Sequence, residues 1–275
     1  MAGEWRIGLS KAGVSLLQAS SWWRPTLTTV GQCVLPAQDA ASPTAVTAAL
    51  DGLLREAGRS YKRTRIIVGE PWVRSWMVSP PAQASLLADC RVAAAARFQT
   101  LYGEPLTAWE STADWQARQD FLAVALHSSL LAALKHLAAD HRLVLLEITP
   151  LFVAAWNRWR HAIKPQAWLG VVNDRTLTIG VPSGRRLGTL RRVPMPIAEA
   201  TRDWLVQALR LEAMKLMLSM PAELQLCGEV PASWTQAESD DGLTCSRLDA
   251  EVRLDGQVNA GAASSAVALA ATGWR

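Results

Sequence analysis

Cysteine, histidine and charge are all scarce in this sequence. The 275 residues include 4 cysteines and 4 histidines; no cysteines form a CxxC pair, and no histidine lies at a zinc-site spacing. This excludes a disulfide scaffold and disfavours a structural metal site. Lys and Arg number 28 against 24 Asp and Glu, a net charge of +4. The basic residues form no stripe with interleaved aromatics, so we expect no nucleic-acid partner.

Long apolar runs are missing as well. The longest, residues 143–156, is interrupted by Glu147, Thr149 and Pro150. The Ala- and Ser-rich tail, 258–272, is shorter than the roughly 20 residues of a membrane span. The N-terminus has no signal-peptide pattern. Because half of the residues are hydrophobic and 19% are charged, we expect a folded cytoplasmic protein with a large core and no membrane span.

Strands and helices alternate in the first half of the predicted structure. Alternating apolar residues predict two strands over 5–19 with a turn at 11–13, and helical spacing of leucines predicts a helix over 44–58. The remaining predicted strands are 26–35, 65–69, 72–78, 107–112, 115–119, 120–126 and 143–148, and the remaining helices are 85–102, 128–140 and 150–161. Strands 107–112 and 115–119 are expected to form a hairpin, and Ser128 or Ser129 to cap the helix that follows.

The second half repeats this order. We predict strands at 167–173, 175–182, 188–193 and 223–227, a helix at 199–220 and an edge strand at 247–254. Both halves therefore open with a three-strand meander and continue with crossover helices, which indicates a duplicated α/β fold. We assign residues 1–163 to the first half, with a reduced inserted subdomain at about 65–119, and residues 164–275 to the second half.

Four segments in this order resemble a known family. They are RIGLSKAGVSLLQ (6–18), FLAVALHSSLLAALKHLAADHRLVLLEITPLFVAAW (121–156), AWLGVVNDRTLTIGVPSGRRLGTLRRVP (167–194) and ELQLCG (223–228). They are similar to the actin-like PilM and GspL cytoplasmic-domain family of type IV pilus and type II secretion assemblies. The resemblance implies an actin-like (RNase H-like) fold of two subdomains, each with a mixed sheet flanked by helices.

The same resemblance locates a degraded nucleotide site. Working actin-like ATPases carry an acidic residue in each meander turn and a run of glycines in the adenosine loop, which hold magnesium and phosphate. Here the acidic positions hold Ser10 and Asn173, and Gly228 is the one glycine left of the run. A shift by one residue would let Asp174 take the role of Asn173. We expect no catalytic residue, no bound metal and no cofactor.

Tryptophan is abundant, with 13 residues against 2 tyrosines and 3 phenylalanines. Trp and Arg are enriched at binding hot spots, although tryptophans can equally fill a core. Two groups combine both residue types on one face, by strand or helical spacing. These candidate partner-binding residues are Trp72, Arg74 and Trp76 in one group, and Trp156, Trp159 and Arg160 in the other.

Our first hypothesis is a non-catalytic actin-like scaffold of a type IV pilus or type II secretion assembly. Its groove would accept the cytoplasmic tail of an inner-membrane partner similar to PilN, as an extended peptide. The alternative is an active actin-like ATPase or kinase that uses Mg-ATP with Asp174 as the metal-holding carboxylate. Weaker alternatives are an RNase H-like nuclease, built on Asp174 with Glu70 or Glu147, and an unrelated α/β protein. The sequence leaves a homo-oligomer open.

Overall fold

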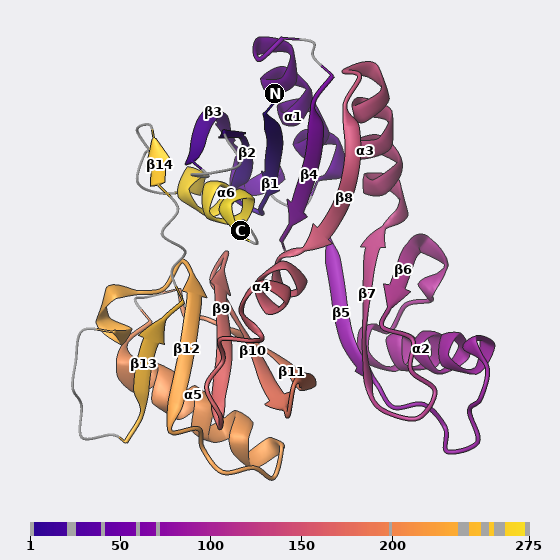
Figure 1. Ribbon diagram of the computed structural model, residues 1–275, viewed down its shortest axis with the longest axis vertical. Coiled ribbons are helices and arrows are strands. Elements are labelled where there is room, and N and C mark those ends of the chain that lie inside the picture. The colour runs from indigo at the N-terminus through magenta and orange to yellow at the C-terminus, as the bar shows by residue number, and fades with distance from the viewer. Residues whose placement is uncertain are drawn as a thin grey trace.

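The structure is a computed structural model, and it describes residues 3–20, 26–39, 42–58, 61–69, 72–197, 200–235, 242–248, 253–255 and 262–272. Figure 1 shows three bodies, each built on its own sheet, with helix α4 (Leu151–Trp159) near the point where they meet. The sheets have six, five and three strands within the described residues. The fold is α/β, with mixed sheets flanked by helices, as the sequence predicts.

The first sheet has the order β14-β3-β2-β1-β4-β8. Its central meander is antiparallel, whereas β4 and β8 run parallel to β1 because crossover helices join them. The strands are β1 (Glu4–Leu9), β2 (Gly13–Ser20), β3 (Thr26–Val34), β4 (Arg63–Val68), β8 (Val144–Pro150) and β14 (Arg253–Asp255). The predicted strands at 5–19, 26–35, 65–69 and 143–148 are confirmed.

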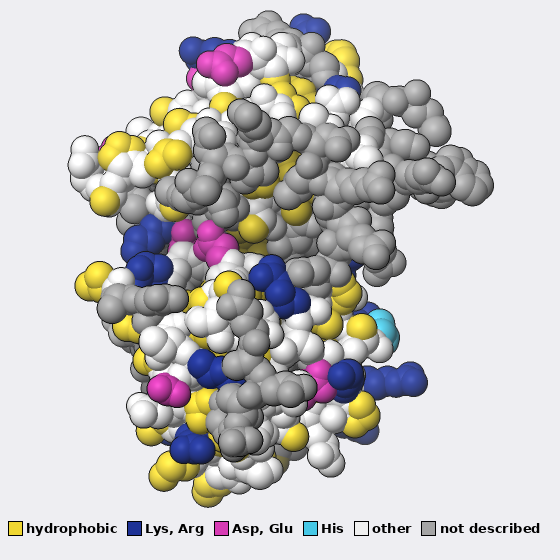
Figure 2. All heavy atoms as spheres, turned by 90° about the vertical axis from the view of Figure 1, so that its left-hand side faces the viewer, with side chains coloured by type: hydrophobic (Ala, Val, Ile, Leu, Met, Phe, Trp, Pro, Cys, Tyr) yellow, Lys and Arg dark blue, Asp and Glu magenta, His cyan; other side chains and the backbone are white. Residues whose placement is uncertain are grey.

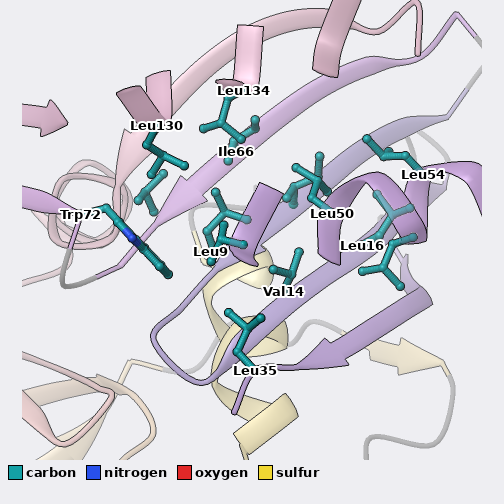
Figure 3. Packing of buried hydrophobic residues seen from close by; sticks show 14 of the residues in the cluster. Leu9, Val14, Leu16, Leu35, Leu50, Leu54, Ile66, Trp72, Leu130 and Leu134 are labelled. Atoms are coloured by element: carbon teal, nitrogen blue, oxygen red, sulfur yellow. The ribbon is translucent and has the colours of Figure 1, made fainter. Parts of the chain in front are cut away.

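Helices α1 (Pro43–Glu56) and α3 (Ser128–Asp140) cover one face of this sheet. In Figure 3, Leu50 and Leu54 of α1 and Leu130 and Leu134 of α3 lie over strand residues such as Leu9. Alternate strand residues supply the apolar face of the sheet, and leucines at helical spacing supply the helix faces. Ser42 caps α1 by accepting a hydrogen bond from the Ala45 amide, 3.2 Å away.

The other face of the first sheet is covered by α6 (Ala262–Ala271), which comes from the end of the chain. Gly8 permits this contact, since a Cβ atom there would collide with the Ala266 carbonyl. The buried Arg6 donates to the carbonyl oxygens of Ala270 (2.7 Å) and Thr272 (2.6 Å) at the end of α6. Burial lowers the pKa of Arg6 to about 10, so its guanidinium stays protonated at neutral pH.

This return corrects two expectations about the tail. We assigned 164–275 to the second half, but β14 pairs in parallel with β3 and α6 packs on β1 and β2. The single edge strand predicted at 247–254 is instead two short strands in different sheets. The tail returns to the first sheet because α6 presents a face of small alanine side chains, which fits closely over Gly8 in β1. The residue pattern along the tail does not show that the first sheet has a surface complementary to α6.

The second sheet has the order β11-β10-β9-β12-β13, with α5 (Arg202–Lys215) on one face and α4 on the other. Its strands are β9 (Ala167–Asn173), β10 (Thr176–Ser183), β11 (Arg186–Pro194), β12 (Glu223–Gly228) and β13 (Thr244–Arg247). Strand β9 is buried throughout, as expected for a central strand covered on both faces. The second predicted meander is therefore confirmed.

The third sheet has the order β5-β7-β6, with β7 antiparallel to both neighbours. Its strands are β5 (Val73–Val78), β6 (Trp109–Ala113) and β7 (Phe121–His127), and α2 (Leu87–Tyr102) covers one face. An aromatic cluster fills that interface, with Trp76 edge-on to Phe98 at 5.0 Å between ring centroids. These elements cover most of the predicted insertion at 65–119; treating them as a separate subdomain remains our proposal.

Several local predictions were wrong. Residues 115–119 form no strand, and β6 pairs with β7 instead. The reason is that alternate apolar side chains of β7 are buried against α2. Helix α5 is shorter than 199–220: Thr201 caps it through the Trp204 amide, and it ends at Lys215. No serine caps α3, whose N-cap is His127. Three short 3-10 helices complete the described elements: η1 (Ala37–Asp39), η2 (Leu106–Ala108) and η3 (Ala232–Trp234).

Candidate functional site

Ser10 lies in the turn between β1 and β2 and is fully buried. Its hydroxyl oxygen accepts hydrogen bonds from the amides of Ala12 (3.1 Å) and Gly13 (3.0 Å). The hydroxyl also donates to the Gly13 carbonyl, 3.2 Å away. A serine commonly stabilises a tight turn in this way. The Ser10 side chain is therefore committed to the turn itself, where an acidic residue would have faced a metal.

Asp174 lies in the matching turn between β9 and β10. Asp174 and Arg175 have φ angles of 46° and 60° and form the two central residues of a hairpin turn of the type that needs positive φ. The Asp174 carboxylate reaches across to the first turn, where its Oδ2 atom accepts a hydrogen bond from the Lys11 amide, 2.8 Å away. This bond joins the turns of the first and second sheets.

Gly228 lies at the end of β12, beside the same turn. Its φ angle is 92°, and a Cβ atom there would collide with the Val172 carbonyl. The glycine therefore permits a close crossing of two strands. The next residue, Glu229, donates its amide to the Val172 carbonyl (2.9 Å) and accepts the Asp174 amide with Oε2 (3.1 Å).

The predicted residues Ser10, Asn173, Asp174 and Gly228 thus lie in one region, where both turns meet the end of β12. A phosphate would need backbone N–H groups pointing into open space. Here two such N–H groups, those of Lys11 and Asp174, donate hydrogen bonds to carboxylates of the chain. Gly69, at the end of β4, approaches Asn173 closely, since a Cβ atom there would lie 2.9 Å from the Asn173 side-chain oxygen.

The cavity beside this region has a volume of about 30 Å³. It lies between the first and second sheets, and Gly69, Phe152, Asn173 and Arg192 are among its lining residues. That volume holds about one water molecule, whereas ligand pockets usually measure about 300–1,000 Å³. As lined by the described residues, this cavity is too small for a nucleotide.

The carboxylates considered for a nuclease do not converge in the described structure. Glu147 lies on the outer strand β8 and forms an ion pair with Arg65 at 2.7 Å. Glu70 lies outside the described residues. In the part of the chain that the structure describes, no three His, Cys, Asp or Glu residues are grouped as metal ligands. Cys90 and Cys227 are free, buried cysteines that pack as small apolar residues.

Of the two tryptophan groups, the first is part of the core. Trp72 and Trp76 are 3% and 2% exposed, and the Trp76 indole donates to the Ala94 carbonyl at 3.2 Å. Arg74 shares a face with Trp76, as predicted, and lies 5.2 Å above the Tyr102 ring. The prediction of a partner surface here was wrong, because Trp72 packs in the core of the first sheet and helix α2 covers the face of the third sheet that carries Trp76. Residue type and strand period in the sequence could not show that other elements bury these side chains.

The second group lies beside a groove. Trp156 is 8% exposed and stacks on Phe152 at 6.4 Å, while Arg160 is exposed at the end of α4. Trp156 and Arg160 both line a hollow of about 430 Å³, whereas Trp159 does not. Trp159 is partly buried, with the Arg158 guanidinium 4.6 Å from its ring.

This hollow lies between the third sheet, α4 and the turn that joins β10 to β11. The third sheet contributes its uncovered face, because Thr112, Leu122 and Val124 alternate with the residues that face α2. A second hollow of about 220 Å³ continues along the same face toward α3 and β8, and Thr112 and Val124 line both. We call the two hollows together the sheet groove.

Two sequence signals could have indicated the sheet groove. Strand β7 is apolar on both faces: Leu122, Val124 and Leu126 alternate with the residues that face α2. A helix that covers one face does not account for this second apolar set. Arg185 and Arg186 lie at a hairpin tip and line the larger hollow. The segments that build this hollow are distant in sequence, so only the folded chain brings them together. On the face shown in Figure 2, Lys and Arg side chains are scattered rather than gathered in one stripe.

The fold is shared with solved structures of low sequence identity. The PilM–PilN type IV pilus biogenesis complex matches at a TM-score of 0.66 and 14% identity, over 98% of both chains. A Bacteroides thetaiotaomicron protein with an actin-like ATPase fold and unknown function matches at 0.57 and 12%, over 84% of this chain and 83% of that one. This chain has an actin-like fold.

A further solved structure shares the fold. The cytoplasmic domain of EpsL, an inner-membrane component of the Vibrio cholerae type II secretion system, has a TM-score of 0.57 and 11% identity, over 98% of this chain and 93% of that one. No known family model and no curated protein matches the sequence. None of the helices in the described ranges has the length and apolar character to cross a membrane.

Proposed function

We propose that this chain is a non-catalytic, actin-like cytoplasmic scaffold of a type IV pilus or type II secretion assembly. In this role it binds the cytoplasmic tail of an inner-membrane protein similar to PilN. The PilM–PilN complex and the cytoplasmic domain of EpsL, which share the fold over 98% of this chain, support the assignment to such assemblies. A protein in this position needs no membrane span of its own, because its partner provides one.

The observation that carries the non-catalytic role is the hydrogen bond between the Asp174 carboxylate and the Lys11 amide. In an ATPase this carboxylate would hold magnesium, and the amides of the turns would bind phosphate. Here the carboxylate binds the amide directly. The remaining cavity, of about 30 Å³, is an order of magnitude smaller than a usual ligand pocket.

The sheet groove is the proposed binding site for the tail. Its hollows of about 220 and 430 Å³ follow one sheet face, a shape that suits an extended peptide rather than a compact ligand. Strand β6 lines both hollows and is an edge strand within the described sheet. An extended peptide lying on this face can therefore place its side chains in both hollows.

The test uses a labelled synthetic peptide of the cytoplasmic tail of the PilN-like protein from the same organism. We expect the peptide to bind the purified chain and Thr112→Arg, which fills the groove between its hollows, to abolish binding. The control is Gln99→Arg, an exposed position on α2, which covers the opposite face of the sheet. Absence of binding in fluorescence anisotropy, or equal binding by both variants, would contradict the proposal.

An ATPase or kinase is the competing function, and a thermal melt separates the two. A ligand at about 100 times its Kd stabilises a protein by about 2.7 kcal/mol. For a chain of this size that raises Tm by several degrees, at roughly 2–4 °C per kcal/mol. We expect no rise with millimolar Mg-ATP. A clear rise that Asp174→Ala abolishes would overturn the non-catalytic role.

A further inference from the structure

We propose that the sheet groove selects a tail segment in which an acidic side chain lies about four residues from a bulky apolar side chain. This inference rests on the proposed function and specifies the chemistry of the partner. It is carried by an arginine wall on one side of the larger hollow, formed by Arg160, Arg185 and Arg186, and by the apolar character of the smaller hollow.

The arginine wall is held in place by rigid elements. Arg160 is the C-cap residue of α4, and its amide donates to the Trp156 carbonyl at 2.8 Å. Arg185 and Arg186 lie at a tight hairpin turn whose first residue, Gly184, has a φ angle of 60°. All three residues therefore line the larger hollow from the side of α4 and the β10–β11 turn.

These guanidinium groups have no hydrogen bond or ion pair with any side chain among the described residues. Arginines elsewhere do: Arg191 pairs with Glu212 at 2.6 Å, and Arg65 pairs with Glu147 at 2.7 Å. A guanidinium presents five N–H donors in a fixed fork that matches a carboxylate. A cluster of three without acceptors therefore favours an acidic ligand group.

The opposite wall determines how the peptide lies. Asp114 and Asp120 line the hollow on the side of the third sheet, and Asp114 accepts a hydrogen bond from Gln116 at 3.3 Å. These carboxylates repel an acidic side chain from their side of the groove. Successive side chains of an extended peptide point to opposite sides. The acidic side chain therefore faces the arginine wall and its immediate neighbours face the sheet. The side chain four residues away points to the same side as the acidic one, where Leu131 and Ile148 line the smaller hollow.

The smaller hollow takes the apolar side chain. It is lined mainly by apolar residues, including Leu126, Leu131 and Ile148. Leu126 belongs to this hollow and Leu122 to the larger one, and they are four residues apart on β7. Four residues of extended chain span about 13 Å, at about 3.3 Å per residue. A peptide lying along β7 therefore needs the same spacing between its apolar and acidic side chains.

The experiment measures binding of the PilN-like tail peptide by fluorescence anisotropy, in the full chain and at several salt concentrations. The test variant is Arg160→Gln with Arg185→Gln and Arg186→Gln. The matched control is Arg97→Gln with Arg210→Gln, exposed arginines of α2 and α5 outside both hollows. Circular dichroism establishes that both variants are folded.

We expect the test variant to raise Kd at least about tenfold, or about 1.4 kcal/mol, and to reduce the salt dependence of binding. The control variant changes Kd less than about twofold. Replacing the acidic residue of the peptide by its amide has the same effect, and the two changes are non-additive because they remove one interaction.

The outcomes separate the two proposals. A tail that binds with unchanged Kd in the arginine variant, or that contains no acidic residue at this spacing, overturns the inference and leaves the proposed function standing. A tail that does not bind at all overturns the proposed function, and the inference fails with it.

Discussion

Asp174→Gly tests the link between the two halves of the fold. The substitution removes the carboxylate that accepts the Lys11 amide at 2.8 Å, while glycine readily adopts the φ angle of 46°. A hydrogen bond to a charged group contributes about 1.5–3 kcal/mol, and solvent exposure of this pair reduces the value to about 1 kcal/mol. The entropy that glycine adds to the unfolded state roughly offsets its relief of backbone strain.

We therefore expect Tm to fall by about 2–4 °C in Asp174→Gly. Asp174→Asn keeps one acceptor oxygen and a residue type that tolerates positive φ, so it should lose about half as much. Hydrogen exchange of the Lys11 amide should accelerate about fivefold for a loss of about 1 kcal/mol.

The matched control is Met217→Gly, at a φ angle of 55° on a side chain that is 93% exposed. It introduces glycine at a similar backbone angle without removing a hydrogen bond, so its Tm should stay the same or rise. If Asp174→Gly melts with the wild type and the Lys11 amide exchanges at an unchanged rate, the carboxylate does not join the halves, and the argument against a nucleotide site loses its main support.

Two further predictions concern stability. Gly8→Ala should destabilise the protein by about 2 kcal/mol or more, because its Cβ collides with the Ala266 carbonyl and displaces α6. Limited proteolysis should then cleave the tail faster, and an unchanged cleavage rate would refute the tight contact. Glu212 is buried, which raises its pKa, but the ion pairs with Lys215 and Arg191 outweigh burial and hold the pKa below its usual 4.5. Its contribution to stability is therefore present above that pH and is lost as the pH falls through the lower, folded-state pKa. Glu212→Gln should lower Tm at pH 7 and flatten the loss of stability in acid, whereas parallel acid profiles of variant and wild type would contradict the assignment.

The sequence predicted the elements whose pattern is local and strong. Both meanders, α1 and α3 follow from strand alternation and from leucines at helical spacing, since each buries one face. The order of those elements predicted a duplicated α/β fold, and the resemblance of four segments implied its actin-like form. Two predictions were wrong about which segments pair: residues 115–119 form no strand because β6 pairs directly with β7, and the tail, from far along the chain, joins the first sheet.

The features of the candidate sites also divide into those that the sequence indicated and those that only the structure showed. From the sequence alone, the resemblance to the actin-like family implies that the usual acidic residues and glycines of a nucleotide site are replaced, because residue identity at a turn is local information. Only the tertiary structure decided that the Asp174 carboxylate binds the Lys11 amide, that Trp76 is core, and that Arg160 joins Arg185 along one groove. Burial and pairing depend on which distant surfaces pack together. The residue pattern of one segment does not specify which other segments will contact it.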